Sequence, residues 1–107
     1  MNYRNSLPRE KKEYKTLSEY YEHLYHYLKK RGVIILRSIR DEKFLENPRG
    51  ALENILEFYA FVKIMRGEAD KDSPGYWRNG VITLCDTALK RTIDKLFNFT
   101  QKSKGGK

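Results

Sequence analysis

The stretch from Leu52 to Met65 constrains the fold of this chain more than any other segment. Its apolar residues leave almost no polar side on a helix: Leu52, Ile55, Leu56, Phe58, Tyr59, Phe61, Val62, Ile64 and Met65. A helix that is apolar all round is either the central element of a helical domain or packs on a second chain as well. The segment therefore predicts an all-helical domain arranged around one central helix.

The residues that flank this stretch predict where the helix begins and ends. Asn47 is a good helix cap, and Pro48 suits the first helical position, where its missing backbone N–H costs nothing. Gly67 predicts the end of the helix, near Arg66, because glycine is common just beyond a helix. The sequence thus predicts a helix over residues 48–66.

A second Pro-containing boundary predicts the last helix. Residues 67–75 have a loop composition, and Ser73-Pro74 repeats the Asn47-Pro48 pattern, with Asp72 and Ser73 as expected caps. The helix is expected over residues 74–99. Its apolar stripe consists of Trp77, Val81, Leu84, Ala88 and Leu96, widened by Ile82, Leu89 and Ile93. The Lys/Gly-rich residues 100–107 are expected to be a disordered tail.

The N-terminal third predicts a basic arm and another helix. Pro8 could open a short helix within residues 1–15, and a disordered arm is the alternative. Thr16 and Glu19 form a capping-box pattern, which predicts a helix ending at Gly32. Its buried stripe is expected to be Leu17, Tyr20, Tyr21, Leu24 and Leu28.

Val33 to Leu36 is ambiguous, because four aliphatic residues in a row also suit a short strand. No other segment offers a partner strand, so a second helix over residues 33–46 is the favoured interpretation. Ile35, Leu36 and Ile39 would point inward, and Phe44 and Leu45 would pack near its end. The expected fold is an all-α, compact four-helix bundle-like domain over residues 16–99, with a basic arm and a flexible tail.

Composition narrows the class of protein. The 107 residues include 22 Lys and Arg against 14 Asp and Glu, a formal charge of +8. Residues 1–32 carry net +4, residues 33–72 net −1 and residues 73–107 net +5. Two basic ends flank a near-neutral apolar centre, which suggests a polyanionic partner.

The residues that carry chemistry are few. A lone Cys85 excludes an internal disulfide, and two histidines with only one cysteine exclude the usual zinc-finger and iron–sulfur ligand sets. No apolar run approaches the roughly 18 residues that span a bilayer. A soluble, cytoplasmic protein is therefore expected.

No catalytic set stands out. Glu19, Glu22, His23 and His26 share one helix face, but that face is expected to be exposed and to form Glu–His pairs rather than a metal site. The acids of residues 68–72 lack the spacing of a calcium loop. Cys85 is expected to be a buried thiol. The expected protein is not an enzyme and has no cofactor or metal.

The basic groups are the better lead. Nucleic-acid backbone contacts are expected from Arg78, Lys90, Arg91, Lys95, Lys102 and Lys104 at the C-terminal end, and from Arg9, Lys11 and Lys12 on the arm. Point charges on a surface suffice to bind RNA or single-stranded DNA through phosphates. Exposed tyrosines such as Tyr25 could stack on bases. Phe58 and Phe61 are the expected contacts with other protein subunits.

Three other interpretations of the charge stay open. The lysines could form a solvated face that aids solubility. A basic helix could also lie on an anionic membrane, although its apolar residues are needed for the core. The chain could instead be an adaptor or inhibitor that docks an acidic protein partner through its basic surface.

The plan as a whole resembles the small α-helical subunit of CRISPR effector complexes. The resemblance rests on the apolar helix from Leu52 to Met65, the basic helix with Lys90, Arg91 and Lys95, and the basic ends. It covers the chain as architecture and includes no signature motif. It implies a compact helical protein without an active site that lines nucleic acid in a multi-subunit antiviral assembly.

Overall fold

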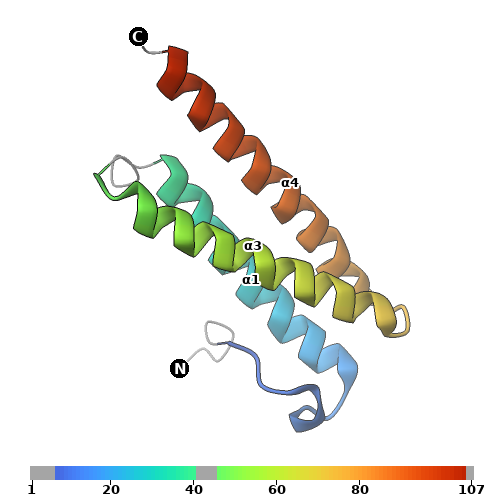
Figure 1. The fold of residues 1–107 in the computed structure, drawn as a ribbon. Helices are drawn as coiled ribbons and strands as arrows, with labels where there is room; N and C mark the ends of the chain where they lie inside the picture. Colours follow the sequence, from blue (N-terminus) through green and yellow to red (C-terminus); the bar gives the residue numbers. More distant parts are fainter. Residues whose placement is uncertain (1–6, 41–45, 106–107) are drawn as a thin grey trace.

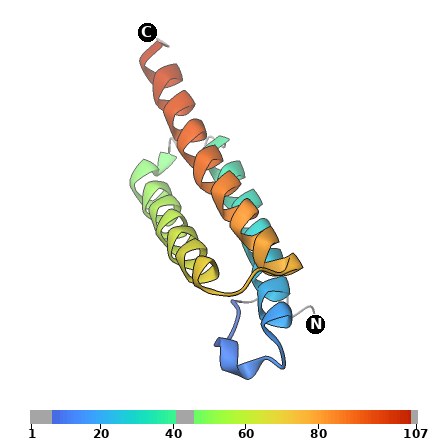
Figure 2. The ribbon, with the colours of Figure 1, turned by 90° about the vertical axis from the view of Figure 1, so that its right-hand side faces the viewer.

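Three helices form the fold of the computed structural model, which describes residues 7–40 and 46–105. They are α1 (Leu17–Arg40), α3 (Pro48–Lys71) and α4 (Tyr76–Gly105), preceded by a short 3₁₀ helix, η2 (Lys11–Glu13). Figures 1 and 2 show an up-down-up arrangement, in which α1 and α4 run the same way and α3 runs against both. The all-α prediction is confirmed, but the described residues form three helices rather than the expected four.

The difference arises at Gly32, where α1 does not stop. The helix continues through Gly32 to Arg40, so the expected second helix is the second half of α1, and Val33 to Leu36 are helical. No described glycine has a positive φ, so Gly32 does not adopt the left-handed conformation of a helix cap. The next turn buries Ile35 in the core, and this burial outweighs the roughly 1 kcal/mol helix penalty of glycine. Phe44, Leu45 and the side chain of Ile39 lie outside the described residues.

A substitution at Gly32 tests whether α1 is continuous. A Cβ added there would lie 3.5 Å from Phe58 Cζ, an ordinary van der Waals distance. Gly32→Ala is therefore expected to raise the free energy of unfolding by about 0.5–1 kcal/mol, the gain of alanine in a helix interior. Urea unfolding followed by circular dichroism measures it. Destabilisation of similar size would mean that Gly32 is a left-handed cap after all.

Helix α3 begins as its sequence predicts and ends later. The Asn47 side chain accepts a hydrogen bond from the Gly50 backbone N–H at 3.2 Å, and Pro48 is the first helical residue. The helix passes Gly67 and ends at Lys71, beyond the expected end at Arg66. Ala69 is fully buried in this additional turn, which gives the turn a packing partner. The loop that follows is consequently shorter than expected.

Helix α4 is also longer than expected and projects from the bundle. It begins at Tyr76 and continues to Gly105, so residues 100–105 are helical rather than a disordered tail. Figures 1 and 2 show its C-terminal end reaching beyond the other two helices, consistent with a molecule 55 Å long and only 28 Å and 16 Å across. The expected cap residue Asp72 instead ends α3, where its backbone N–H bonds to the Ala69 carbonyl at 3.1 Å.

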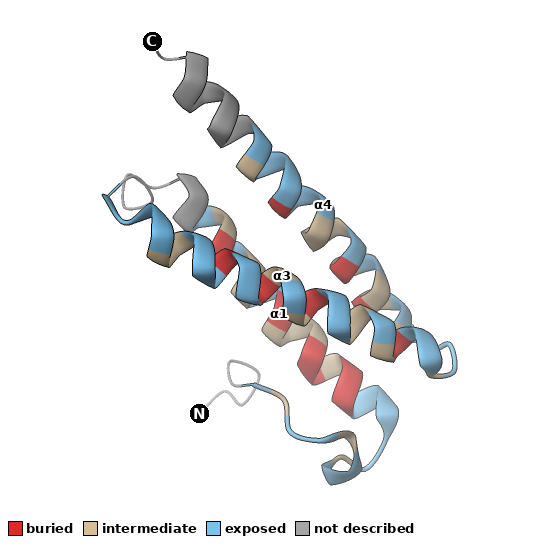
Figure 3. Cartoon of the chain, viewed as in Figure 1, coloured by how far each residue is buried: buried red, intermediate tan, exposed pale blue. Residues whose placement is uncertain are grey.

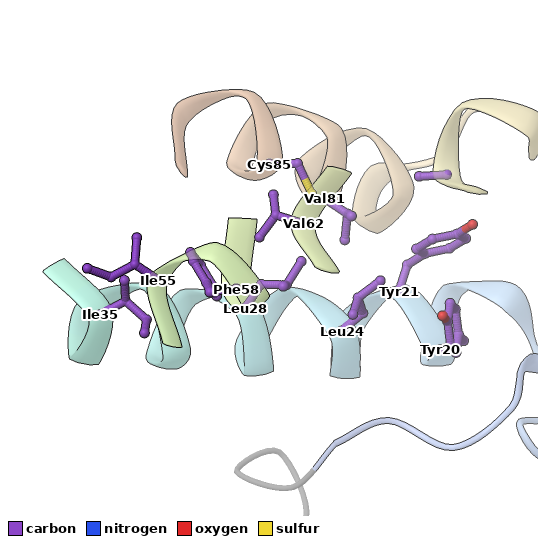
Figure 4. Packing of buried hydrophobic residues seen from close by; sticks show 11 residues of the cluster. Tyr20, Tyr21, Leu24, Leu28, Ile35, Ile55, Phe58, Val62, Val81 and Cys85 are labelled. Atoms are coloured by element: carbon purple, nitrogen blue, oxygen red, sulfur yellow. The ribbon is translucent and has the colours of Figure 1, made fainter. Parts of the chain in front are cut away.

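The core lies along the axis where the three helices meet (Figure 4). Its side chains come from α1 (Tyr20, Tyr21, Leu24, Leu28 and Ile35), α3 (Ile55, Phe58, Val62 and Ala69) and α4 (Val81 and Cys85). The expected stripe of the first helix is confirmed except at Leu17, which is exposed. The helical spacing of these residues places them on one side of each helix.

The arm before α1 packs against the bundle. Within it, Glu10 and Glu13 form a capping box around η2. The Tyr14 hydroxyl and His23 Nδ1 share a hydrogen bond of 2.7 Å, and the Tyr14 ring meets Tyr20 edge-on. This contact buries His23, which was expected on a solvent face. The sequence of α1 alone does not predict this burial, because Tyr14, which contacts His23, belongs to the arm.

Candidate nucleic-acid interface

The best candidate for a polyanion surface is the basic cluster on α4, which we define as Lys90, Arg91 and Lys95. All three residues are exposed. None takes part in an ion pair recorded among the described residues. One acid, Asp94, lies within the cluster and is also exposed. The cluster therefore offers cations that are not already engaged by acidic side chains of the described chain.

The cluster lies on a part of α4 that still packs against the bundle. Thr92, between Arg91 and Lys95, is only 1 % exposed, and Leu89 and Leu96 pack against the core. Figure 3 shows buried, intermediate and exposed positions following one another along this part of α4. The three cations therefore project into solvent from turns in which other positions face the core.

Arg78, expected in the same patch, has a structural role instead. Its Nε donates to the Ala69 carbonyl at 2.8 Å, and Nη2 donates to the Asp70 carbonyl at 3.4 Å. Both carbonyls belong to the last turn of α3, where the i+4 N–H partners of a helix interior are missing, and the Ala69 carbonyl also accepts from the Asp72 N–H. The side chain is only 16 % exposed. The expectation that Arg78 contacts phosphates is corrected accordingly: its donors cap α3.

Of the three arm residues expected to contact nucleic acid, Lys11 has a structural role, whereas Arg9 and Lys12 are exposed. Lys11 Nζ lies 2.8 Å from Asp72 Oδ2 and 3.9 Å from Glu68 Oε2, so it fastens the arm to the end of α3. Arg9 and Lys12 are exposed; Arg9 lies over the Tyr14 ring, and Lys12 pairs with Glu10 at 3.3 Å. The side chains of Lys102 and Lys104 lie outside the described residues. Of the expected set, the α4 cluster is the part that the structure leaves exposed and unengaged.

A groove between α1 and α4 lies next to this cluster. It has a volume of about 520 Å³ and is lined by Tyr25, Tyr76, Trp77, Gly80, Thr83, Leu84 and Thr87. Lys90 and Arg91 follow Thr87 by three and four residues, so they lie one helical turn from the groove. On the α1 side, Lys29 Nζ lies 6.0 Å from the centre of the Tyr25 ring. Cations therefore stand at the groove on both helices.

The sequence does not predict this groove. It predicts an exposed Tyr25 and places Trp77 in the core stripe, whereas both rings are partly buried against the core and also line the groove. Tyr76 and Lys29 are not among the residues predicted to form a site. The Tyr25 and Trp77 rings meet at 5.6 Å, and the Tyr76 and Trp77 rings at 5.1 Å. A signal existed in the consecutive aromatic residues at the start of α4, directly after Pro74 and Gly75.

The expected protein contacts need correction as well. Phe58 is only 4 % exposed and lies in the core, so it is not available to a neighbouring protein. Phe61 is partly buried and packs edge-on against Tyr27. Other large apolar residues on α3 and α4 are more than half exposed: Leu56, Ile64, Ile93 and Phe97. The apolar residues of α3 thus form two faces, one that is buried in the core and one that is exposed and includes Leu56 and Ile64.

The structure also bears on the cysteine, on a possible metal site and on a possible membrane span. Cys85 is fully buried, and burial raises the pKa of its thiol to about 12, as expected for a core cysteine. Across residues 7–40 and 46–105, no three His, Cys, Asp or Glu side chains are grouped to hold a metal ion. In the same part of the chain, no helix has the length and apolar character needed to cross a bilayer.

Comparison with known proteins gives no further guide to this surface. No protein-family model, no curated protein and no solved structure matches the chain. The resemblance to the small subunit of CRISPR effector complexes stays a prediction.

Proposed function

We propose that the protein is a non-enzymatic helical subunit that binds the backbone of RNA or single-stranded DNA. The observation that carries the proposal is the exposed cluster of Lys90, Arg91 and Lys95 on α4. Phosphate binding needs positive charges on an accessible surface and no particular scaffold. Arg9 and Lys12 on the arm are secondary contacts, and Arg78 and Lys11 are left out because they hold the fold together.

The alternative partner, an acidic protein, would use the same charges. The aromatic groove next to the cluster favours nucleic acid, since bases stack on exposed aromatic rings and carboxylates do not. The formal charge of +8 also favours an extended polyanion over a small acidic patch. The exposed cluster supports both alternatives, whereas the groove and the net charge favour nucleic acid.

Salt dependence of binding tests the proposal. Fluorescence anisotropy of a labelled oligonucleotide is to be measured at several KCl concentrations. The logarithm of the binding constant should fall linearly with the logarithm of the salt concentration, with a slope of about −2 for three phosphate contacts on a single strand. Binding that does not change between low and moderate salt would contradict a phosphate-binding surface.

A contact with another protein subunit is the second part of the proposal. It is supported by Leu56 and Ile64, which are both more than half exposed on the outer face of α3. Exposed apolar side chains that share one helix face suit a contact with another protein, whereas a phosphate backbone offers them no apolar partner. The test is to identify a protein that copurifies with the chain and to coexpress the two. The double variant Leu56→Glu with Ile64→Glu should no longer copurify with this partner, and its oligonucleotide binding should be unchanged. Retention of the partner would overturn this part.

A further inference from the structure

We infer that the groove between α1 and α4 takes an unpaired base of a single strand, stacked against Tyr76 and Trp77. The inference rests on the proposed function and goes beyond it: it names single-stranded nucleic acid as the ligand and assigns a base-binding site. Four observations carry it: the volume of the groove, the rings that line it, the cations beside it and the glycine in its lining.

The groove has the size and lining of a ligand site. Its volume of about 520 Å³ lies within the range of roughly 300–1,000 Å³ that is typical of ligand pockets. Most of its lining is aromatic or aliphatic, with two hydroxyl groups from Thr83 and Thr87. A flat aromatic ring with polar edges, such as a nucleobase, matches this combination of apolar walls and a few hydrogen-bonding groups.

The rings of the groove are arranged to leave one of them free for stacking. Trp77 is held from several sides, edge-on by Tyr25 and at a tilt by His26, at ring distances of 5.6 Å. Tyr76 is 83 % exposed and touches Trp77 nearly perpendicularly, at 89°. A fixed indole beside an exposed phenol ring forms a corner, in which a base can stack on one ring and meet the edge of the other.

The cations decide between a nucleic acid and an uncharged ligand. Lys29 stands over Tyr25 on one side, and Lys90 and Arg91 lie one turn beyond Thr87 on the other. A strand whose base occupies the groove would place its phosphates toward these groups. A duplex keeps its bases stacked inside, so only unpaired bases can enter.

Gly80 lines the groove without contributing a side chain. A Cβ added at this position would lie 3.5 Å from two carbons of the Tyr25 ring. A methyl group fits there, whereas a longer side chain meets the Tyr25 ring and either occupies the groove or displaces that ring. This position therefore allows the groove to be filled without changing a charge or an aromatic ring.

Intrinsic fluorescence offers a direct test, because Trp77 is the single tryptophan of the chain. The protein is titrated with oligothymidylate, with oligouridylate and with a fully paired DNA duplex at low salt. Single strands should quench Trp77 emission, and the duplex should not. Tyr76→Ala and Gly80→Leu should each weaken single-strand binding about tenfold, the usual share of one stacked base, and leave duplex binding unchanged. Circular dichroism verifies that both variants keep the helical fold.

The outcomes separate this inference from the proposed function. If both variants bind single strands as well as the unaltered protein, or if Trp77 emission does not respond, the base site is wrong while backbone binding stands. If no oligonucleotide binds at all, the proposed function fails as well. Quenching of Trp77 by poly-glutamate, with displacement of oligothymidylate, would overturn the base site in favour of an acidic peptide.

Discussion

Reversal of the α4 cluster is expected to lower the affinity for single-stranded nucleic acid at low salt by about 100-fold or more. The change is Lys90→Glu, Arg91→Glu and Lys95→Glu in one chain. It replaces three attractive contacts with phosphate by three repulsive ones, and it removes the associated release of counterions. The fold should be retained, because the three side chains are exposed and form no ion pair recorded within the described residues. Anisotropy titrations measure the affinity, and circular dichroism measures the helical content.

A matched control separates a local surface from overall charge. Arg49→Glu, Lys63→Glu and Lys71→Glu change the net charge by the same amount, and all three residues are exposed on α3. These residues lie on a different helix from the α4 cluster, and none of them lines the groove. The control variant is therefore expected to lose only a few-fold in affinity. Equal losses in the two variants would mean that the overall charge attracts the polyanion. Loss of helicity in the α4 variant alone would show that the cluster serves the fold.

The helices were largely predictable from the sequence because each core stripe repeats along its own helix. The Asn47 cap and most inward residues of α1 follow from local spacing. Leu17 and Ile93, expected in the buried stripes, are exposed, and the all-round apolar sequence of α3 does not predict which side faces the core. The number of helices was not predictable, because a glycine can either end a helix or remain inside one. At Gly32 and Gly67 the outcome depends on Ile35 and Ala69, whose burial is determined by other helices.

The candidate site was also predictable only where it depends on a single helix. The exposure of the α4 cluster was predictable from its helix alone, whereas the roles of Lys11 and Arg78 were not. The partner of Lys11 is Asp72, sixty-one residues away in the sequence. The groove depends on the meeting of Tyr25 and Trp77 from two helices. Charge and spacing identify candidate cations, but only tertiary contacts decide which of them are already engaged.

Asp72→Asn is expected to lower the free energy of unfolding by about 1–3 kcal/mol near neutral pH. The Asp72 carboxylate accepts hydrogen bonds from Lys11 Nζ at 2.8 Å and from the hydroxyl of Tyr21. It thereby joins the arm, α1 and the end of α3 at one point. Hydrogen bonds to a charged group contribute more than neutral ones, and asparagine keeps the shape of the side chain while removing the charge. Thermal or urea unfolding of the two proteins measures the difference.

The pH dependence of this difference identifies its cause. The hydrogen bonds from Lys11 and Tyr21 lower the pKa of Asp72 below its ordinary value of 3.8 in the folded protein. Above that value the carboxylate is ionised in both states, and its interactions stabilise only the folded one. As the pH falls below about 4, the unfolded chain takes up the proton first, so the stabilisation is lost as the pH approaches the lowered folded-state pKa. The stability gap between the unaltered protein and Asp72→Asn should therefore close in acid.

Two further variants show whether the junction acts as a unit. Asp94→Asn removes a carboxylate that is exposed on α4, and it should change the stability by no more than about 0.5 kcal/mol. Lys11→Met should destabilise the unaltered protein but have little additional effect in Asp72→Asn, because the lysine has then lost its principal partner. Additive losses from Lys11→Met and Asp72→Asn, or a stability gap that persists in acid, would show that the arm is not held by this charge pair. In that case the Tyr14–His23 contact would be the main attachment of the arm, and Tyr14→Phe would have the larger effect.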